Sequence, residues 1–194
     1  MFHVVTAFIA LYVMGRFIWP LRVSLPGKWV LSALLLLVAE HHLITRNVFG
    51  SMASPEIPGE VLIALGWAFG SLIVLALLLL MRDVIGLLTY FVSPQKGREL
   101  LRNRRLNAAL GIISVGLSLL GVWQAIRVPD VKNIEVTVPH LPAQMDGLRL
   151  VQLSDLHASR LLQAPWMQAV FEKTNALQPD LIVIPGDLVD GSPT

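Results

Sequence analysis

Long uncharged stretches dominate the first two thirds of the sequence. Residues 61–80 and 106–126 form runs of 20 and 21 residues without a charged side chain. Because an α-helix rises about 1.5 Å per residue, each run is long enough to cross a hydrocarbon core of about 30 Å. Two shorter apolar stretches, 1–19 and 29–45, contain a few polar residues. The pattern predicts an α-helical membrane region of about four transmembrane helices.

The pattern changes in the last third of the chain. Apolar runs at 148–153 and 181–184 have the length of β-strands, and the segment 165–177 between them carries apolar residues at spacings of three and four. A strand, a helix and a second strand in this order predict a βαβ unit with parallel strands and a right-handed crossover. We interpret it as the N-terminal part of an α/β domain.

An alternating apolar and polar stretch at 134–138 predicts one earlier strand. We therefore expect three parts in the chain. They are a transmembrane helical region at 1–126, a linker with the first strand at 127–146, and the partial α/β domain at 147–194.

Short acidic motifs follow both strands of the predicted βαβ unit. Asp155 and His157 come after the first strand, and Asp187 comes after the second. Parallel neighbouring strands end at the same edge of a sheet, where α/β proteins bind ligands. Asp155 and His157 are one residue apart, so in an extended segment their side chains project to the same side. The three residues are candidate metal ligands, and their mixture of carboxylate and imidazole suits Mn, Fe or Zn better than Ca.

The same residues also have an ordinary structural interpretation. An Asp after a strand often caps the next helix, and Asp190 followed by Gly191 is a common turn signal. For each residue taken singly, the two interpretations are equally balanced. Because two motifs flank a helix of suitable length, we favour the metal site.

The two motifs, Asp155-Leu156-His157 and Gly186-Asp187-Leu188-Val189-Asp190, resemble the opening of the calcineurin-like metallophosphoesterase superfamily. They resemble its membrane-associated bacterial branch most. The resemblance implies that Asp155 and His157 bind one of two divalent metal ions, that Asp187 bridges both, and that Asp190 supports the loop. It also implies hydrolysis of a phosphoric ester by a metal-activated water.

The later motifs of that superfamily, a G-N-H-[ED] block, a lone His and a G-H-x-H block, do not occur in these 194 residues. The resemblance places the His that assists the leaving group in those motifs. We therefore expect a chain truncated after its second motif and inactive by itself. The nucleotide sequence that follows the codon for Thr194 would test this expectation.

Composition and charge fit a membrane protein. Hydrophobic residues make up 55% of the chain and charged residues 14%, against about 25% charged residues in soluble domains. With four spans, one side of the membrane receives nine basic residues, and the positive-inside rule makes that side cytoplasmic. The α/β part then lies on the outer side of a cell inner membrane that the chain crosses several times. The nine residues are Arg16, Arg22, Lys28, Arg82, Lys96, Arg98, Arg102, Arg104 and Arg105.

Two polar clusters have competing interpretations. The basic cluster at 96–105 is interpreted as a topology determinant rather than a nucleic-acid site, because it lies between two predicted spans, and we expect no nucleic-acid partner. Glu40, His41 and His42 lie near the outer end of a short span. We favour an interfacial anchor there over a proton relay or a metal contact.

Two functional hypotheses follow. The first is a membrane-anchored metal-dependent phosphoesterase, whose partners would be membrane lipid and a phosphate ester substrate that is itself lipid-linked. The alternative is a non-enzymatic polytopic membrane protein, a transport, assembly or sensing module with a remnant domain.

Overall fold

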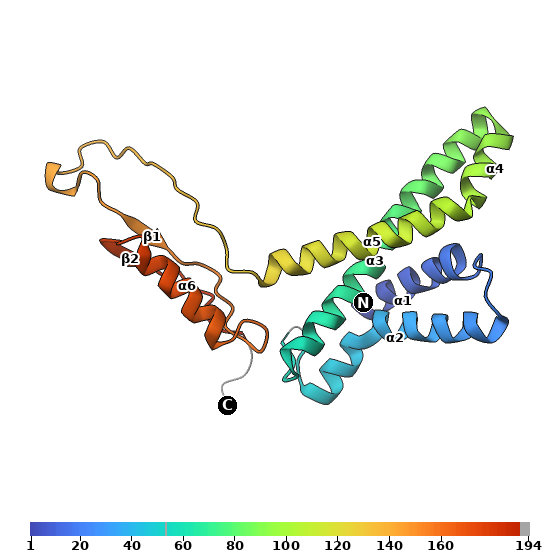
Figure 1. The fold of residues 1–194 in the computed structure, drawn as a ribbon, viewed down its shortest axis with the longest axis horizontal. Helices are drawn as coiled ribbons and strands as arrows, with labels where there is room; N and C mark the ends of the chain where they lie inside the picture. Colours follow the sequence, from blue (N-terminus) through green and yellow to red (C-terminus); the bar gives the residue numbers. More distant parts are fainter. Residues whose placement is uncertain (53, 191–194) are drawn as a thin grey trace. The chain divides into compact units, whose positions relative to one another are not determined.

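The computed structural model describes residues 1–52 and 54–190 (Figure 1). The chain divides into two units, Met1–Ala125 and Ile126–Thr194. The first unit is helical. Its elements are α1 (Phe2–Val13), the π-helical turn η1 (Met14–Ile18), α2 (Leu25–Phe49), α3 (Gly59–Val92), α4 (Pro94–Arg102) and α5 (Arg104–Ile126).

Three helices of the described residues are long and apolar enough to cross a membrane, namely α2, α3 and α5, with 25, 34 and 23 residues. The first apolar stretch of the sequence forms α1 and η1, which together run only from Phe2 to Ile18. At about 1.5 Å per residue this segment falls short of a hydrocarbon core of about 30 Å. Three candidate spans are therefore present in the described part of the chain, and a fourth stays a prediction.

The ends of α2 follow local sequence signals. Ser24 precedes the helix, and its hydroxyl accepts a hydrogen bond from the Gly27 N–H at 3.3 Å. Pro26 lies in the first turn, where its missing N–H costs nothing. Gly50 ends the helix with a φ of 72°, a left-handed conformation that glycine adopts without a steric penalty.

The chain reverses direction between α3 and α4. Ser93 has an extended backbone, with a φ of −146°, and Pro94 starts the new helix. The helix α4 then packs back along the end of α3, and a Cβ atom at Gly97 would lie 2.5 Å from the Cα atom of Tyr90. Only glycine allows this approach. The two helices therefore form a closely packed hairpin.

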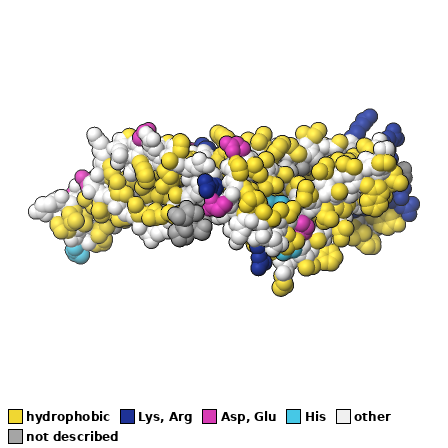
Figure 2. Space-filling model, turned by 90° about the horizontal axis from the view of Figure 1, so that it is seen from below, with side chains coloured by type: hydrophobic (Ala, Val, Ile, Leu, Met, Phe, Trp, Pro, Cys, Tyr) yellow, Lys and Arg dark blue, Asp and Glu magenta, His cyan; other side chains and the backbone are white. Residues whose placement is uncertain are grey.

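A small apolar core joins the helices of the first unit. Val13 of α1, Ala39 of α2, Leu79 of α3 and Leu110 of α5 are all buried in it. Most other large apolar side chains of these helices face outward, and Figure 2 shows hydrophobic side chains over much of the visible surface. An apolar outer surface of this kind is expected for helices in contact with lipid.

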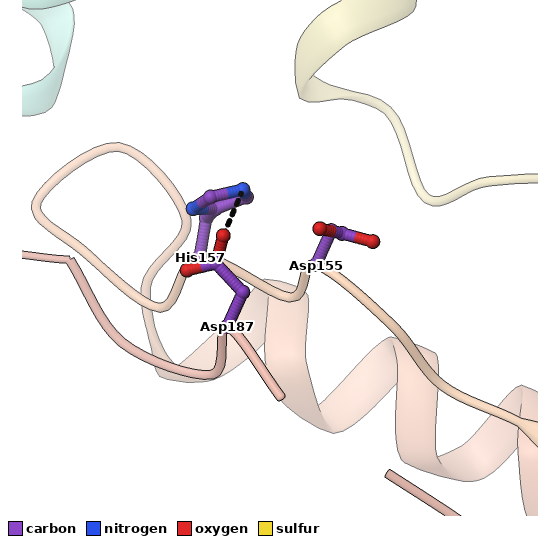
Figure 3. A group of neighbouring side chains, drawn as sticks. All are labelled: Asp155, His157 and Asp187. Atoms are coloured by element: carbon purple, nitrogen blue, oxygen red, sulfur yellow. Dashed lines mark ion pairs between the residues drawn. The ribbon is translucent and has the colours of Figure 1, made fainter. Parts of the chain in front are cut away.

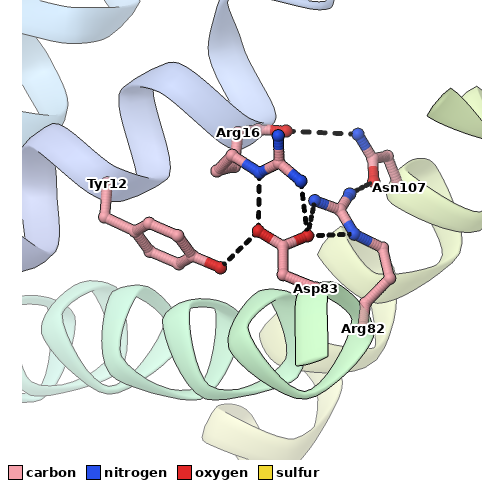
Figure 4. A network of polar contacts seen from close by, with 5 residues as sticks. All are labelled: Tyr12, Arg16, Arg82, Asp83 and Asn107. Carbon is pink, nitrogen blue, oxygen red and sulfur yellow. Dashed lines mark hydrogen bonds and ion pairs between the residues drawn. The ribbon is translucent and has the colours of Figure 1, made fainter. Parts of the chain in front are cut away.

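A polar network crosses this bundle (Figure 4). The carboxylate of Asp83 accepts hydrogen bonds from Tyr12 Oη at 2.8 Å and from Arg16 Nε at 2.6 Å. It also accepts from the neighbouring Arg82. Arg82 in turn donates to Asn107, whose amide donates to the carbonyl of Arg16 at 3.2 Å. The network therefore ties together α1 with η1, α3 and α5.

The cluster at 40–42 joins the start of α1 to the end of α2. The Glu40 carboxylate accepts a hydrogen bond from the Thr6 hydroxyl at 2.8 Å and lies 3.5 Å from Nδ1 of His3. The ring of His42 packs edge-on against Phe2 and Phe69. Glu40 and His42 thus contact α1, and His42 also contacts α3.

The second unit contains two short parallel strands with a helix between them in the sequence. They are β1 (Leu150–Gln152) and β2 (Leu181–Val183), and Leu150 pairs with Leu181. The helix α6 (Ala164–Ala176) has Pro165 in its first turn, where proline is well tolerated. A 3₁₀ turn, η2, spans Ala143–Met145.

The strand predicted at 134–138 is not formed in the structure. A strand needs a neighbour for its backbone hydrogen bonds, and the only pairing among the described strands joins β1 and β2. Ile134 and Val136 stay 71% and 72% exposed, so the alternating pattern here has no surface to pack against.

Candidate metal centre

The loops that follow β1 and β2 continue side by side beyond the strands. The N–H of His157 donates to the carbonyl of Asp187 at 3.3 Å, and the N–H of Ala158 donates to the carbonyl of Leu188 at 2.9 Å. The N–H of Asp190 donates back to Ala158 at 3.0 Å. These backbone bonds hold the two acidic motifs of the sequence against each other.

The three candidate ligands come together at this edge (Figure 3). Asp155 and His157 lie on the first loop and Asp187 on the second, and one ligand atom from each lies within 4.8 Å of the others. The Nε2 atom of His157 is 3.5 Å from a carboxylate oxygen of Asp187. Among residues 1–52 and 54–190, these three form the single group of His, Asp and Glu side chains arranged to hold a cation.

The backbone reaches this arrangement in an unexpected way. Asp155, His157 and Asp187 have φ values of 56°, 45° and 54°. The prediction of an extended segment around Asp155 is therefore wrong, because both residues of the first loop lie in the left-handed region. Asp and His adopt this region more readily than most residues other than glycine.

Gly186 precedes the second ligand and has a φ of 152°. Side chains rarely tolerate this conformation, although no atom lies within 4 Å of the position that a Cβ would take. Glycine is therefore required here for its backbone conformation. Gly186 turns the chain so that Asp187 can meet the loop after β1.

Asp190 contacts the opposite nitrogen of the candidate ligand His157. One carboxylate oxygen of Asp190 lies 3.0 Å from Nδ1 of His157. This contact with Asp190, together with the negative charges of Asp187 and Asp155, raises the pKa of His157 above its usual value. A carboxylate at Nδ1 also fixes the ring so that Nε2 faces the other ligands, as in many metal sites.

The chain is similar in sequence to several proteins that are named metallophosphoesterases. No protein-family model and no solved structure matches the chain. A transmembrane protein with a metallophosphoesterase domain from Danio rerio is 39% identical over 79 residues, which are 41% of this chain and 18% of the relative. An uncharacterized metallophosphoesterase from Campylobacter jejuni is 33% identical over 85 residues, 44% of this chain and 22% of the relative.

The UDP-2,3-diacylglucosamine pyrophosphatase LpxG of Chlamydia trachomatis is 32% identical over 87 residues, 43% of this chain and 26% of the relative. The resemblance to metallophosphoesterases is confirmed. The chain spans about a fifth to a quarter of the length of these metallophosphoesterases.

The donor set fits a divalent cation. Two carboxylates and one imidazole lie within 4.8 Å of one another, a combination of ligands that suits Mn, Fe or Zn. The side chains of His157 and Asp187 are 41% and 53% exposed. Because these side chains are exposed, water and a phosphate group can reach the site. With three protein ligands, a bound cation would keep free coordination positions for water and phosphate, as catalytic metal sites require.

Two features of the site could not be predicted from the sequence. The left-handed conformations of Asp155 and His157 have no sequence signal apart from the known tolerance of Asp and His for that region. The contact between Asp190 and Nδ1 of His157 depends on how the two loops are aligned, and the backbone hydrogen bonds between the loops set that alignment.

Proposed function

We propose that the protein is a membrane-anchored metallophosphoesterase that hydrolyses a phosphoric ester with a metal-activated water. The convergence of Asp155, His157 and Asp187 within 4.8 Å is the observation that carries the proposal. Relatives that are named metallophosphoesterases support the class of reaction. The non-enzymatic alternative has no comparable support.

We assign the roles of the residues from the resemblance to metallophosphoesterases. Asp155 and His157 would hold one cation, and Asp187, on the other loop, would bridge it to a second. A pair of divalent cations, Mn, Fe or Zn, would lower the pKa of a bound water and neutralise the charge of the phosphate. Asp190 orients His157 through Nδ1. The two loops follow the parallel strands β1 and β2, and α6 lies between these strands in the sequence.

The substrate that we favour is carried by a lipid. The name of the chlamydial relative describes a pyrophosphatase for a nucleotide sugar with two acyl groups, and the helices α2, α3 and α5 have the length and composition of membrane spans. A site tethered next to a bilayer meets lipid-linked phosphates at a high effective concentration.

We also propose where the parts of the chain lie relative to the membrane. The helical region at 1–126 crosses the inner membrane, the linker at 127–146 leads away from it, and the part at 147–194 lies on the side opposite to the basic loops. Substrates on the outer side would then be accessible to the site.

Manganese binding and hydrolysis test the proposal. The chain in nanodiscs should bind Mn²⁺, detected by the loss of the free-ion signal in electron paramagnetic resonance. Asp187→Asn should weaken binding at least tenfold, because it removes the charge shared by both ions. Asp146→Asn makes the same change at an exposed residue of the same unit and should bind as the wild type does.

The product of the complete reading frame should hydrolyse bis-p-nitrophenyl phosphate only with a divalent cation, and a chelator should abolish the activity. Asp187→Asn should lose the activity and Asp146→Asn should keep it. Wild-type turnover in the Asp187→Asn protein would refute the bridging role. Absence of both metal binding and hydrolysis in the wild type would favour the non-enzymatic alternative.

A further inference from the structure

The end of α3 carries an apolar surface beyond the polar network. After Arg82 and Asp83 the helix continues for nine residues, 84–92, without another charge. Several of their side chains face outward, since Leu88 is 63%, Phe91 78% and Val92 89% exposed. Large apolar side chains exposed together mark a contact surface rather than ordinary solvated helix.

The helix α4 covers one side of this segment and leaves the other open. Gly97 lies against Tyr90, and the side chain of Leu101 occupies the space beside Gly86. The guanidinium of Arg98 lies over the ring of Tyr90, 5.5 Å from its centre. These contacts fix α4 on the face of α3 opposite to the exposed apolar residues. We call residues 84–105 the α3–α4 hairpin.

The second half of the α3–α4 hairpin is rich in basic side chains. Between residues 96 and 105 there are five Lys or Arg residues and one acidic residue, Glu99, which gives a local net charge of +4. All five basic side chains belong to exposed residues, and Figure 2 shows Lys and Arg gathered at one end of the helical unit. The five are Lys96, Arg98, Arg102, Arg104 and Arg105.

An element that exposes both apolar and basic side chains is suited to bind the headgroup region of an anionic bilayer. Apolar residues enter the boundary between headgroups and acyl chains, and each nearby Lys or Arg adds attraction to anionic lipid. A nucleic-acid site would use the basic residues but leave Leu88 and Val92 in water. Residues 84–92 are the end of α3, a candidate span of 34 residues whose length exceeds a hydrocarbon core of about 30 Å, so this end would reach the headgroup region.

We propose that the α3–α4 hairpin is a binding surface for anionic phospholipids of the adjacent leaflet. Leu88, Phe91 and Val92 lie in the acyl border, and Lys96 and Arg102 contact lipid phosphates. The surface anchors the helical unit at a defined depth. This role does not depend on the metal centre or on hydrolysis.

A single fluorescent probe tests the depth of the α3–α4 hairpin. The chain contains no cysteine, so Val92→Cys supplies one site for an environment-sensitive label such as NBD. In nanodiscs of phosphatidylcholine with added phosphatidylglycerol, the NBD emission should shift to the blue relative to pure phosphatidylcholine. High salt should reduce the shift, because salt screens exposed charges.

Charge variants test the contact with anionic lipid. Lys96→Gln with Arg102→Gln should require a roughly fivefold larger fraction of phosphatidylglycerol, or more, for half of the NBD shift. Arg98 is left in place because it contacts Tyr90. Arg46→Gln with Lys132→Gln also removes two exposed charges, lies outside the hairpin and should respond as the wild type does.

Three outcomes would overturn the proposal. The first is equal NBD emission with and without phosphatidylglycerol, and the second is a wild-type response of the Lys96 and Arg102 variant. The third is binding of a labelled single-stranded oligonucleotide that depends on Lys96 and Arg102 while the lipid response is absent, which would make the surface a nucleic-acid site.

Discussion

The Nδ1 atom of His157 lies 3.0 Å from a carboxylate oxygen of Asp190, a residue three positions after the candidate ligand Asp187. The contact joins the two loops through side chains in addition to their backbone bonds. It also leaves Nε2 of His157 facing the site. Asp190 is therefore more than a turn residue.

Asp190→Asn should lower the pKa of His157, because the contact between Nδ1 and the Asp190 carboxylate is the main cause of its raised value. The stabilisation that this contact gives the metal-free chain is present at low pH and is lost as the pH rises through the folded pKa of His157. Titration of the ¹H–¹³C signal of the ring without metal measures the shift. An unchanged pKa would show that Asp190 does not hold the imidazole.

Gly186→Ala should destabilise the second unit by about 1–3 kcal/mol, since a side chain is strained at a φ of 152°. No atom lies within 4 Å of the new methyl group, so the cost comes from the backbone alone. Hydrogen exchange of the amides of β1 and β2 would report it. Gly116→Ala also adds a methyl group in open space, but within the helix α5, and should leave these amides unchanged.

The sequence predicted those features that depend on local pattern. The lengths of the apolar runs predicted α3 and α5, and the spacing of residues in 165–177 predicted α6. The positions of the two acidic motifs after the strands predicted that Asp155 and Asp187 would meet. These outcomes rest on periodicity and on the parallel pairing of neighbouring strands.

Other features depend on which helices and loops pack together, and no local pattern contains that information. Arg16 and Arg82 were interpreted only as topology charges, whereas both donate to Asp83 in the structure. The role of Gly97 requires the return of α4 along α3. The strand at 134–138 was predicted from an alternating pattern that is necessary for a strand but does not supply a partner.

A reporter fused after Asp130 tests the orientation of the chain. Nine basic residues lie in the loops and helix ends of one side, so the positive-inside rule places this junction outside the cytoplasm. Alkaline phosphatase, which needs an oxidising compartment, should be active there, and green fluorescent protein exported through the same route should not fluoresce. A fusion after Lys96 is the matched control and should give the opposite pattern. Reversed activity of the two fusions would refute the orientation.

Asp83→Ala should lower the thermal stability of the helical unit strongly. Arg82 is 4% exposed, and removing Asp83 leaves a buried cation that has, among the described residues, no carboxylate to neutralise it and only the Asn107 amide as a hydrogen-bond partner, at a cost of about 3–5 kcal/mol. A thermal unfolding scan in detergent, followed by circular dichroism, measures the loss.

A double-mutant cycle separates the ion pairs from general damage to the helix. Arg16→Gln should be milder than Asp83→Ala, because Arg16 is more exposed and Asp83 keeps Arg82 as its partner. Since the two residues interact directly, the combined variant should lose less stability than the sum of the single losses. Strictly additive losses would show that Arg16 and Asp83 do not stabilise each other, and the network would then reduce to the contact between Arg82 and Asp83.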